Sequence, residues 1–233
     1  MTFDAAYILV SLKVAIRFLH VTLLLSVIPL AVGIAVGTPI AVCRKFRVRA
    51  VSQAANILIP VLKGIPLVLY VLILNFLILK PLDRLAPYYA WADRLRVMDK
   101  IYIGIAAMSA WAAVTISETM RSALNSVPAG QYEACFSVGL TRTQALRRII
   151  MPQALKFAVP VLCNNFIGLI KGSSIVYVIG ILDILGGAMT SAQINYRFLE
   201  AYIAAALIYW MLCLTVERVS WRLEKRFKLK TGG

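Results

Sequence analysis

Polar and ionisable side chains within long apolar runs are the residues of this sequence best suited to chemistry. Glu118 lies late in one apolar run, and Lys171 lies near the middle of another. A charge at membrane depth is costly unless it faces a partner or water, so both are candidate functional groups. Helical spacing predicts one narrow face of polar and small residues, formed by Asn164, Gly168, Lys171 and Ser174.

Each of these groups also has a structural alternative. Glu118 would share a helix face with Thr115 and Ser122 and could line a pore, or it could reach the inner surface or pair with Arg121. The charge of Lys171 could attract a substrate carboxylate, or it could cap the carbonyls of a broken helix. The polar face suits a pore lining and a subunit interface equally. The substrate or pore candidates are therefore Glu118, Asn164, Lys171, Ser173 and Ser174.

The sequence predicts neither covalent catalysis nor a metal site. The four cysteines are widely scattered without a C-x-x-C pair, and His20 is the single histidine. Scattered cysteines of this kind usually act as small apolar residues. No histidine, cysteine or carboxylate pair has nucleophile–base or metal-ligand spacing, so we expect a chain that is not an enzyme and holds no cofactor.

Membrane-spanning helices must position these candidates. The chain has 233 residues, is 61% hydrophobic and has a mean hydropathy of +0.82, which exceeds the apolar share of soluble domains. Several apolar runs reach the roughly 18 residues that cross about 30 Å of hydrocarbon. We predict an all-α integral membrane protein with a single domain, residues 1–233, and an amphipathic interfacial helix over residues 3–19. Spans are predicted at approximately 21–43, 57–79, 101–120, 157–181 and 199–219.

The net charge of +15 is distributed around these apolar runs. Basic residues gather after the first predicted span, between the third and fourth, and in the carboxyl-terminal tail, as in cytoplasmic segments. Five crossings then place the amino terminus outside and the carboxyl terminus in the cytoplasm. Because the basic residues flank spans instead of forming one stripe, we expect contact with membrane lipid and no binding of nucleic acid.

The polar segment between the third and fourth spans, residues 128–152, has the properties of a docking surface. Residues 131–138 can form two helical turns, and Gly139 suits a left-handed cap or a close backbone approach. Glu133 would be exposed on this short helix, where it could pair with a basic residue of a partner. An ordinary solvated loop is the alternative.

A second, basic helix is predicted to follow the first. Thr141 is of a residue type that caps helix N-termini. Proline lacks the backbone N–H that a helix interior needs, so we expect this helix to end at Pro152.

The spacing in this segment resembles the EAA motif of binding-protein-dependent ABC importer permeases: E-A-A, three residues, G, nine residues, I, one residue, L-P. Matching positions are held by Glu133, Ala134, Gly139, Ile149 and Pro152. Cys135 replaces the second alanine and Met151 replaces the leucine. Further stretches resemble the polar-amino-acid permeases of this superfamily, namely Lys63-Gly64-Ile65-Pro66-Leu67, residues 126–131, residues 160–167 and Lys171-Gly172-Ser173-Ser174.

This resemblance implies a five-span permease with the type I importer fold, in the bacterial cytoplasmic (inner) membrane. Two such subunits, identical or different, would form a pore by alternating access for amino acids or similar small polar solutes. The coupling helix, seated in a separate ABC ATPase that holds ATP and Mg, would contain Glu133, Ala134, Cys135 and Gly139. A solute-binding protein outside the cytoplasm would deliver the substrate. The chain has no G-x-x-x-x-G-K-[ST] phosphate loop, so it cannot supply the ATPase itself.

Two other functional classes make different predictions. In an ion-coupled secondary transporter or a channel, Glu118 and Lys171 would serve proton or ion coupling, and inverted repeats would favour that class. No such repeat is evident in the sequence. In a membrane scaffold protein, the helix containing Glu133 would be a static anchor.

Overall fold

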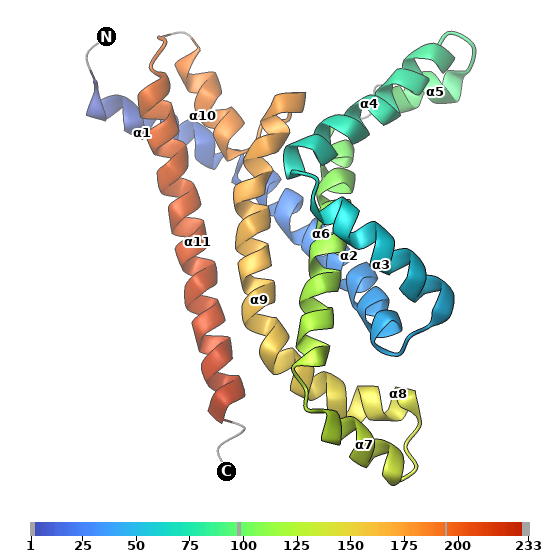
Figure 1. Cartoon of the computed structure of the whole chain (residues 1–233). Coiled ribbons are helices and arrows are strands. Elements are labelled where there is room, and N and C mark those ends of the chain that lie inside the picture. Colours follow the sequence, from blue (N-terminus) through green and yellow to red (C-terminus); the bar gives the residue numbers. More distant parts are fainter. Residues whose placement is uncertain (1–2, 97–98, 194, 230–233) are drawn as a thin grey trace.

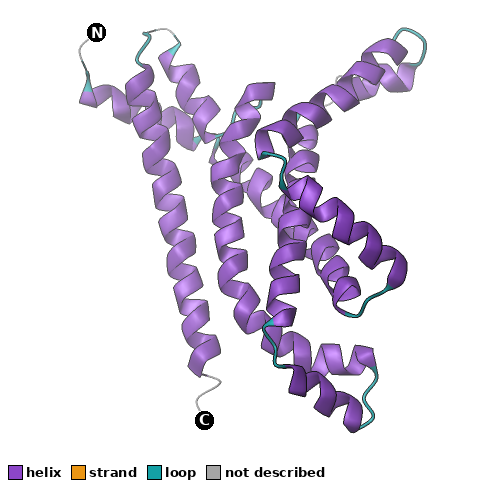
Figure 2. Ribbon diagram, in the orientation of Figure 1, coloured by secondary structure: helices purple, strands orange, loops and turns teal. Residues whose placement is uncertain are grey.

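All regular elements are helical in the computed structural model, which describes residues 3–96, 99–193 and 195–229 (Figure 2). Within those ranges, four helices are long and apolar enough to cross a membrane, and there are five spans if one bent pair counts as a single crossing. The elements are α1 (Ala5–Ile16), α2 (Leu19–Lys45), α3 (Arg49–Lys63), α4 (Leu67–Leu85), α5 (Ala90–Arg96), α6 (Ile101–Asn125), α7 (Ala129–Ser137), α8 (Arg142–Ala145), η1 (Leu146–Ile150), α9 (Met151–Gly172), η2 (Ser173–Ile179), α10 (Ile184–Ala192) and α11 (Phe198–Leu229).

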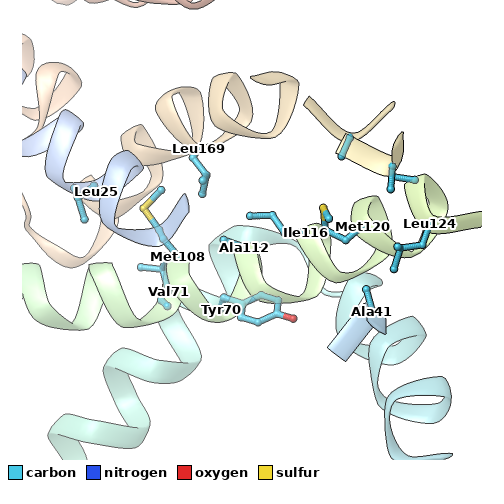
Figure 3. Close-up of a cluster of buried hydrophobic side chains, with 14 of the residues drawn as sticks. Leu25, Ala41, Tyr70, Val71, Met108, Ala112, Ile116, Met120, Leu124 and Leu169 are labelled. Atoms are coloured by element: carbon cyan, nitrogen blue, oxygen red, sulfur yellow. The ribbon is translucent and has the colours of Figure 1, made fainter. Parts of the chain in front are cut away.

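The pairing of α2 with α6 forms the centre of the bundle. Gly33 of α2 lies against Ala112 and Ile116 of α6, and Gly37 lies against the α6 backbone one turn further along. Small residues at such positions let two membrane helices approach closely. The main core surrounds this pair, with α4 and α9 adding side chains on either side. Figure 3 shows Leu25, Val71, Met108, Ile116 and Leu169 among the buried residues of this core.

The second predicted span differs from a straight crossing. Residues 57–79 belong to two helices, α3 and α4, which meet at an angle of 105°. The break is local in origin: Pro66 caps α4 from an extended backbone conformation with ψ 145°, and proline disfavours helical geometry at the residue before it. Tyr70 of α4 stabilises this bend, because its hydroxyl donates a hydrogen bond to the carbonyl of Leu62 in α3 at 2.9 Å.

The prediction that Pro152 ends a helix is wrong. Pro152 lies in the first turn of α9, and the chain passes from α8 through η1 into α9 without a loop. Proline inside a continuous helical stretch removes one backbone hydrogen bond and crowds the preceding turn, where helices bend or widen. The preceding turn is a π-helix, Leu146–Ile150, a widened geometry with i→i+5 hydrogen bonds.

Helices α1 and α10 pack together beside the first part of α11, at one end of the molecule (Figure 1). The predicted amphipathic helix over residues 3–19 corresponds to α1, whose buried residues are Ser11 and Ala15. Asp4 forms an ion pair with Arg197 at 2.7 Å, and the Ser11 and Ser191 hydroxyls lie 2.8 Å apart. The helices α7 and α8 lie at the opposite end, together with the carboxyl-terminal end of α11.

Candidate functional site

The segment between α6 and α9 projects from one end of the bundle as two short helices (Figure 1). Glu133, Ala134 and Phe136 of α7 are exposed, and Val138 beside them has 75% of its surface accessible. The prediction of a short helix carrying an exposed glutamate is confirmed. An acidic group beside exposed apolar side chains can bind a partner that offers a basic residue at the edge of an apolar cleft.

The inner face of α7 is held to three other helices. The Tyr132 hydroxyl donates to the Leu124 carbonyl at 2.8 Å, and Lys45 of α2 lies 4.5 Å from the centre of the Tyr132 ring. Burial raises the pKa of Tyr132 above its ordinary value. Gln153 of α9 donates to the side chain of Gln131 at 3.1 Å. Side chains of α7 therefore contact α2, α6 and α9.

The turn after α7 is built as the sequence predicts. Gly139 has a left-handed backbone with φ 76°. Its N–H donates to the Phe136 carbonyl, and the N–H of Leu140 donates to the Cys135 carbonyl, both at 3.0 Å. These two bonds form a Schellman cap. Thr141 then begins α8 with a capping box, so the predicted N-cap is confirmed.

Cys135 is placed differently from its neighbours in the motif. Its side chain is only 2% exposed and belongs to the main core, together with Ala145 and Ile150. Ala145 and Ile150 come from the elements that follow the turn. Cys135 thus packs α7 against α8 and η1 and does not lie on the outer face of α7.

Glu118 lies within a cluster of charges near the same end of the molecule. Its carboxylate forms an ion pair with Arg44 of α2 and another with Arg121, the latter at 2.8 Å. The side chains of Arg44 and Glu118 are 9% and 19% exposed. The pairing with Arg121 was the structural alternative for Glu118, and the structure adds Arg44 as a second partner. The cluster joins α2 to α6.

The face of α9 named from helical spacing is open over much of its length. Asn164 and Lys171 are exposed, and apart from the two chain neighbours and the adjacent backbone of α9 no atom lies within 4 Å of the position that a Cβ on Gly168 would occupy. Ser174 donates to the Lys171 carbonyl at 2.8 Å. Asn165, one residue from this face, donates to Thr119 of α6 at 2.9 Å. Glu118 and Lys171 do not form an ion pair.

Ser173 belongs to a buried polar cluster that the sequence reasoning missed. Asp183 is fully buried, and its carboxylate accepts hydrogen bonds from the hydroxyls of Ser173, at 3.0 Å, and Tyr209. It also caps α10 by accepting from the Gly186 N–H at 3.1 Å. Burial raises the pKa of Asp183, although these hydrogen bonds oppose the shift. Asp183 is the single acidic residue between positions 157 and 199, which was a usable signal.

Comparison with known proteins identifies the class to which this fold and segment belong. Residues 17–229 match the family described as the binding-protein-dependent transport system inner membrane component. This chain belongs to that family.

Relatives of the permease agree with this assignment. It is 32% identical over 213 residues to the probable amino-acid permease protein YxeN of Bacillus subtilis (strain 168), with 91% of each chain covered. It is 31% identical over 219 residues to the probable amino-acid ABC transporter permease protein PatM of Vibrio harveyi, with 94% of each chain covered.

Solved structures also resemble the permease. A crystal structure of an amino acid ABC transporter with histidines superimposes with a TM-score of 0.82 at 29% identity, covering 97% of this chain and 100% of the other. An inward-facing structure of the MetNI methionine ABC transporter shares the fold, with a TM-score of 0.69 at 19% identity over 92% of this chain and 96% of the other.

The predicted family and the all-α importer-permease fold are therefore confirmed. The permease is a membrane-embedded transport subunit of an ABC importer and not an enzyme, since ATP hydrolysis in this class belongs to a separate subunit.

Proposed function

We propose that this permease conducts an amino acid, or a similar small polar solute, across the bacterial inner membrane, driven by an ATPase that docks on α7. The observation that carries the proposal is the outer face of α7, where Glu133 is exposed on a helix whose inner face is held to α2, α6 and α9. A partner that moves α7 would also move these helices and so switch the pore between outward-facing and inward-facing states. The amino-acid class is supported by relatives such as YxeN and PatM.

Reconstitution with the cognate ATPase and solute-binding protein tests the docking role. Glu133→Ala is expected to weaken ATPase association and to abolish coupled uptake into proteoliposomes, while the permease stays folded. Glu217→Ala removes an exposed glutamate from α11, away from α7, and serves as the matched control. Normal association and coupled uptake in Glu133→Ala would exclude this role, and uptake without any ATPase would exclude the importer mechanism.

The open face of α9 is our candidate for substrate contact. Asn164, Lys171 and Ser174 offer polar groups along one side of a membrane helix, and a fixed positive charge suits a substrate carboxylate. Lys171→Met is expected to raise the KM for uptake by about tenfold, the size of a 1.4 kcal/mol loss of binding, and Lys171→Arg to raise it less. An unchanged KM in Lys171→Met would remove Lys171 from the substrate path.

We also propose an amino terminus outside the membrane and a carboxyl terminus in the cytoplasm. The support is the excess of basic residues in the segments assigned to the cytoplasm. It is consistent with this topology that α7, α8 and the carboxyl-terminal end of α11 lie at the same end of the molecule. A carboxyl-terminal reporter that is active only in the periplasm would give no signal if this topology is correct, and a strong signal if it is inverted.

A further inference from the structure

A basic pocket lies between α2, α3 and α6 at the end of the bundle that carries α7. Its volume is about 300 Å³, and its lining combines four cationic side chains with two amides. The lining residues are Arg44, Lys45, Arg47, Asn56, Arg121 and Asn125.

The positive charge of this pocket is only partly neutralised by the protein. Within the part of the chain that the structure describes, Glu118 is the one carboxylate paired with the lining, through Arg44 and Arg121. Lys45 donates to Asn125 at 3.0 Å and forms no ion pair with an acidic side chain among the described residues. Arg47, in the turn between α2 and α3, forms neither a hydrogen bond nor an ion pair through its side chain within the ranges that the structure describes. Four positive charges against one negative charge predict an anionic ligand.

An apolar groove of about 340 Å³ lies between the same three helices, next to the pocket. Ile40 of α2 lines the groove and precedes Arg44 by four residues, about 6 Å of helix. On α3, Ala55 lines the groove and the adjacent Asn56 lines the pocket. On α6, Val114 lines the groove, and Arg121, about two turns further along, lines the pocket. The two cavities therefore follow one another along α2 and α6, and α3 lines both of them.

We propose that one anionic phospholipid binds at this site, with its phosphate in the basic pocket and an acyl chain in the apolar groove. Basic pockets between membrane helices on the cytoplasmic side suit anionic headgroups. Free phosphate would match the pocket alone, and a second permease subunit would match the groove alone. A phospholipid accounts for both cavities and for their order along α2 and α6. The proposal does not depend on which solute the permease carries.

Native mass spectrometry of the full-length permease in detergent tests this site. With phosphatidylglycerol and phosphatidylcholine present in equal amounts, we expect one phosphatidylglycerol to be retained per chain in preference to phosphatidylcholine. Arg47→Gln should weaken its retention about fivefold, since each basic residue near an anionic lipid contributes about that factor. Arg222→Gln, which removes an exposed charge from α11, should change nothing. Equal retention of both lipids, or equal effects of the two variants, would overturn the proposal.

A second variant tests the groove separately from the charge. Ala54→Phe places a large side chain in the groove and leaves the basic lining intact. We expect it to reduce phosphatidylglycerol retention with an unchanged unfolding temperature. If inorganic phosphate binds as tightly and Ala54→Phe has no effect, the ligand is a free anion and the proposal fails. It also fails if Ala54→Phe disrupts pairing of permease subunits while lipid retention is unaffected.

Discussion

Replacing Gly37 with valine tests whether the close approach of α2 to α6 holds the bundle together. A Cβ at position 37 would lie 2.7 Å from the Ala113 carbonyl oxygen and 2.8 Å from the Ser117 nitrogen. Ordinary contacts begin near 3.4 Å. Both neighbours are backbone atoms of α6, so no side-chain rotation can relieve the overlap, and the two helices must separate by several tenths of an ångström.

The expected loss of stability follows from this overlap. Inserting extra carbons into a packed core costs about 1–3 kcal/mol, and valine brings two methyl groups beyond the Cβ. Valine has a better helix propensity than glycine, and this difference offsets only a few tenths of a kcal/mol of the lost stability. We therefore expect a net loss of about 2–3 kcal/mol, which corresponds to a fall in the unfolding temperature of roughly 4–12 °C for a chain of this size.

Thermal unfolding of the purified permease in detergent measures this effect. Gly168→Val is the matched control, because Gly168 is also helical but, apart from the two chain neighbours and the adjacent backbone of α9, no atom lies within 4 Å of its added Cβ. The control should unfold within about 2 °C of the wild type, consistent with a change of a few tenths of a kcal/mol. Equal unfolding temperatures for the two variants would refute the idea that backbone contact at Gly37 is essential.

Substitutions at three further positions test the other features of the site. Glu118→Gln leaves Arg44 without its carboxylate and should lower the unfolding free energy by about 2–3 kcal/mol. This loss is smaller than for a fully buried ion pair because the side chain of Arg121 is 38% exposed. Unchanged unfolding in detergent would contradict the pairing. Asp183→Ala leaves the buried hydroxyls of Ser173 and Tyr209 without their acceptor and should lower the unfolding free energy by at least about 2 kcal/mol. Asp183→Asn keeps an acceptor oxygen and should lower it less. Burial raises the pKa of Asp183 in the folded state, so the folded protein holds this proton more tightly than the unfolded chain does. The stability of the wild type should therefore fall relative to that of Asp183→Asn as the pH rises from about 4. Parallel profiles of unfolding free energy against pH for the two proteins would contradict this. Gly139→Ala forces a non-glycine residue to φ 76° at a cost of about 1–2 kcal/mol. Local opening of α7 becomes easier by the same amount, so hydrogen exchange of the α7 amides should accelerate about fivefold or more. Unchanged exchange would argue against a strained turn.

Features with local causes were predicted well from the sequence. The helix before Gly139, its left-handed cap and the N-cap at Thr141 depend on residues within a few positions of one another. The apolar run over residues 21–43 lies within the single long helix α2, because length and hydrophobicity are properties of a continuous stretch. The break at Pro66 also has a local cause, but its 105° angle is set by packing and could not be read from the sequence.

Features that depend on distant partners were missed or left open. Arg44 pairs with Glu118 across 74 positions, and Tyr209 binds Asp183 across 26. Spacing along one helix predicts Arg121 as a partner of Glu118, because the two residues are three positions apart. It contains no information about α2, which holds the second partner, Arg44. The expectation at Pro152 failed because proline's effect depends on the helix around it, and only the structure shows the π-helical turn that precedes it.

The sequence by itself determined the membrane class, the family and the position of the segment that contains Glu133. These follow from hydrophobicity, charge distribution and motif spacing, which are properties of the order of residues. The exposure of Glu133 was also expected from the sequence, but only the tertiary structure placed Cys135, two residues later, in the core. It likewise brought the basic pocket and the apolar groove together, because both form where α2, α3 and α6 pack against one another. Exposure and cavities arise from contacts between helices, and a linear pattern does not specify those contacts.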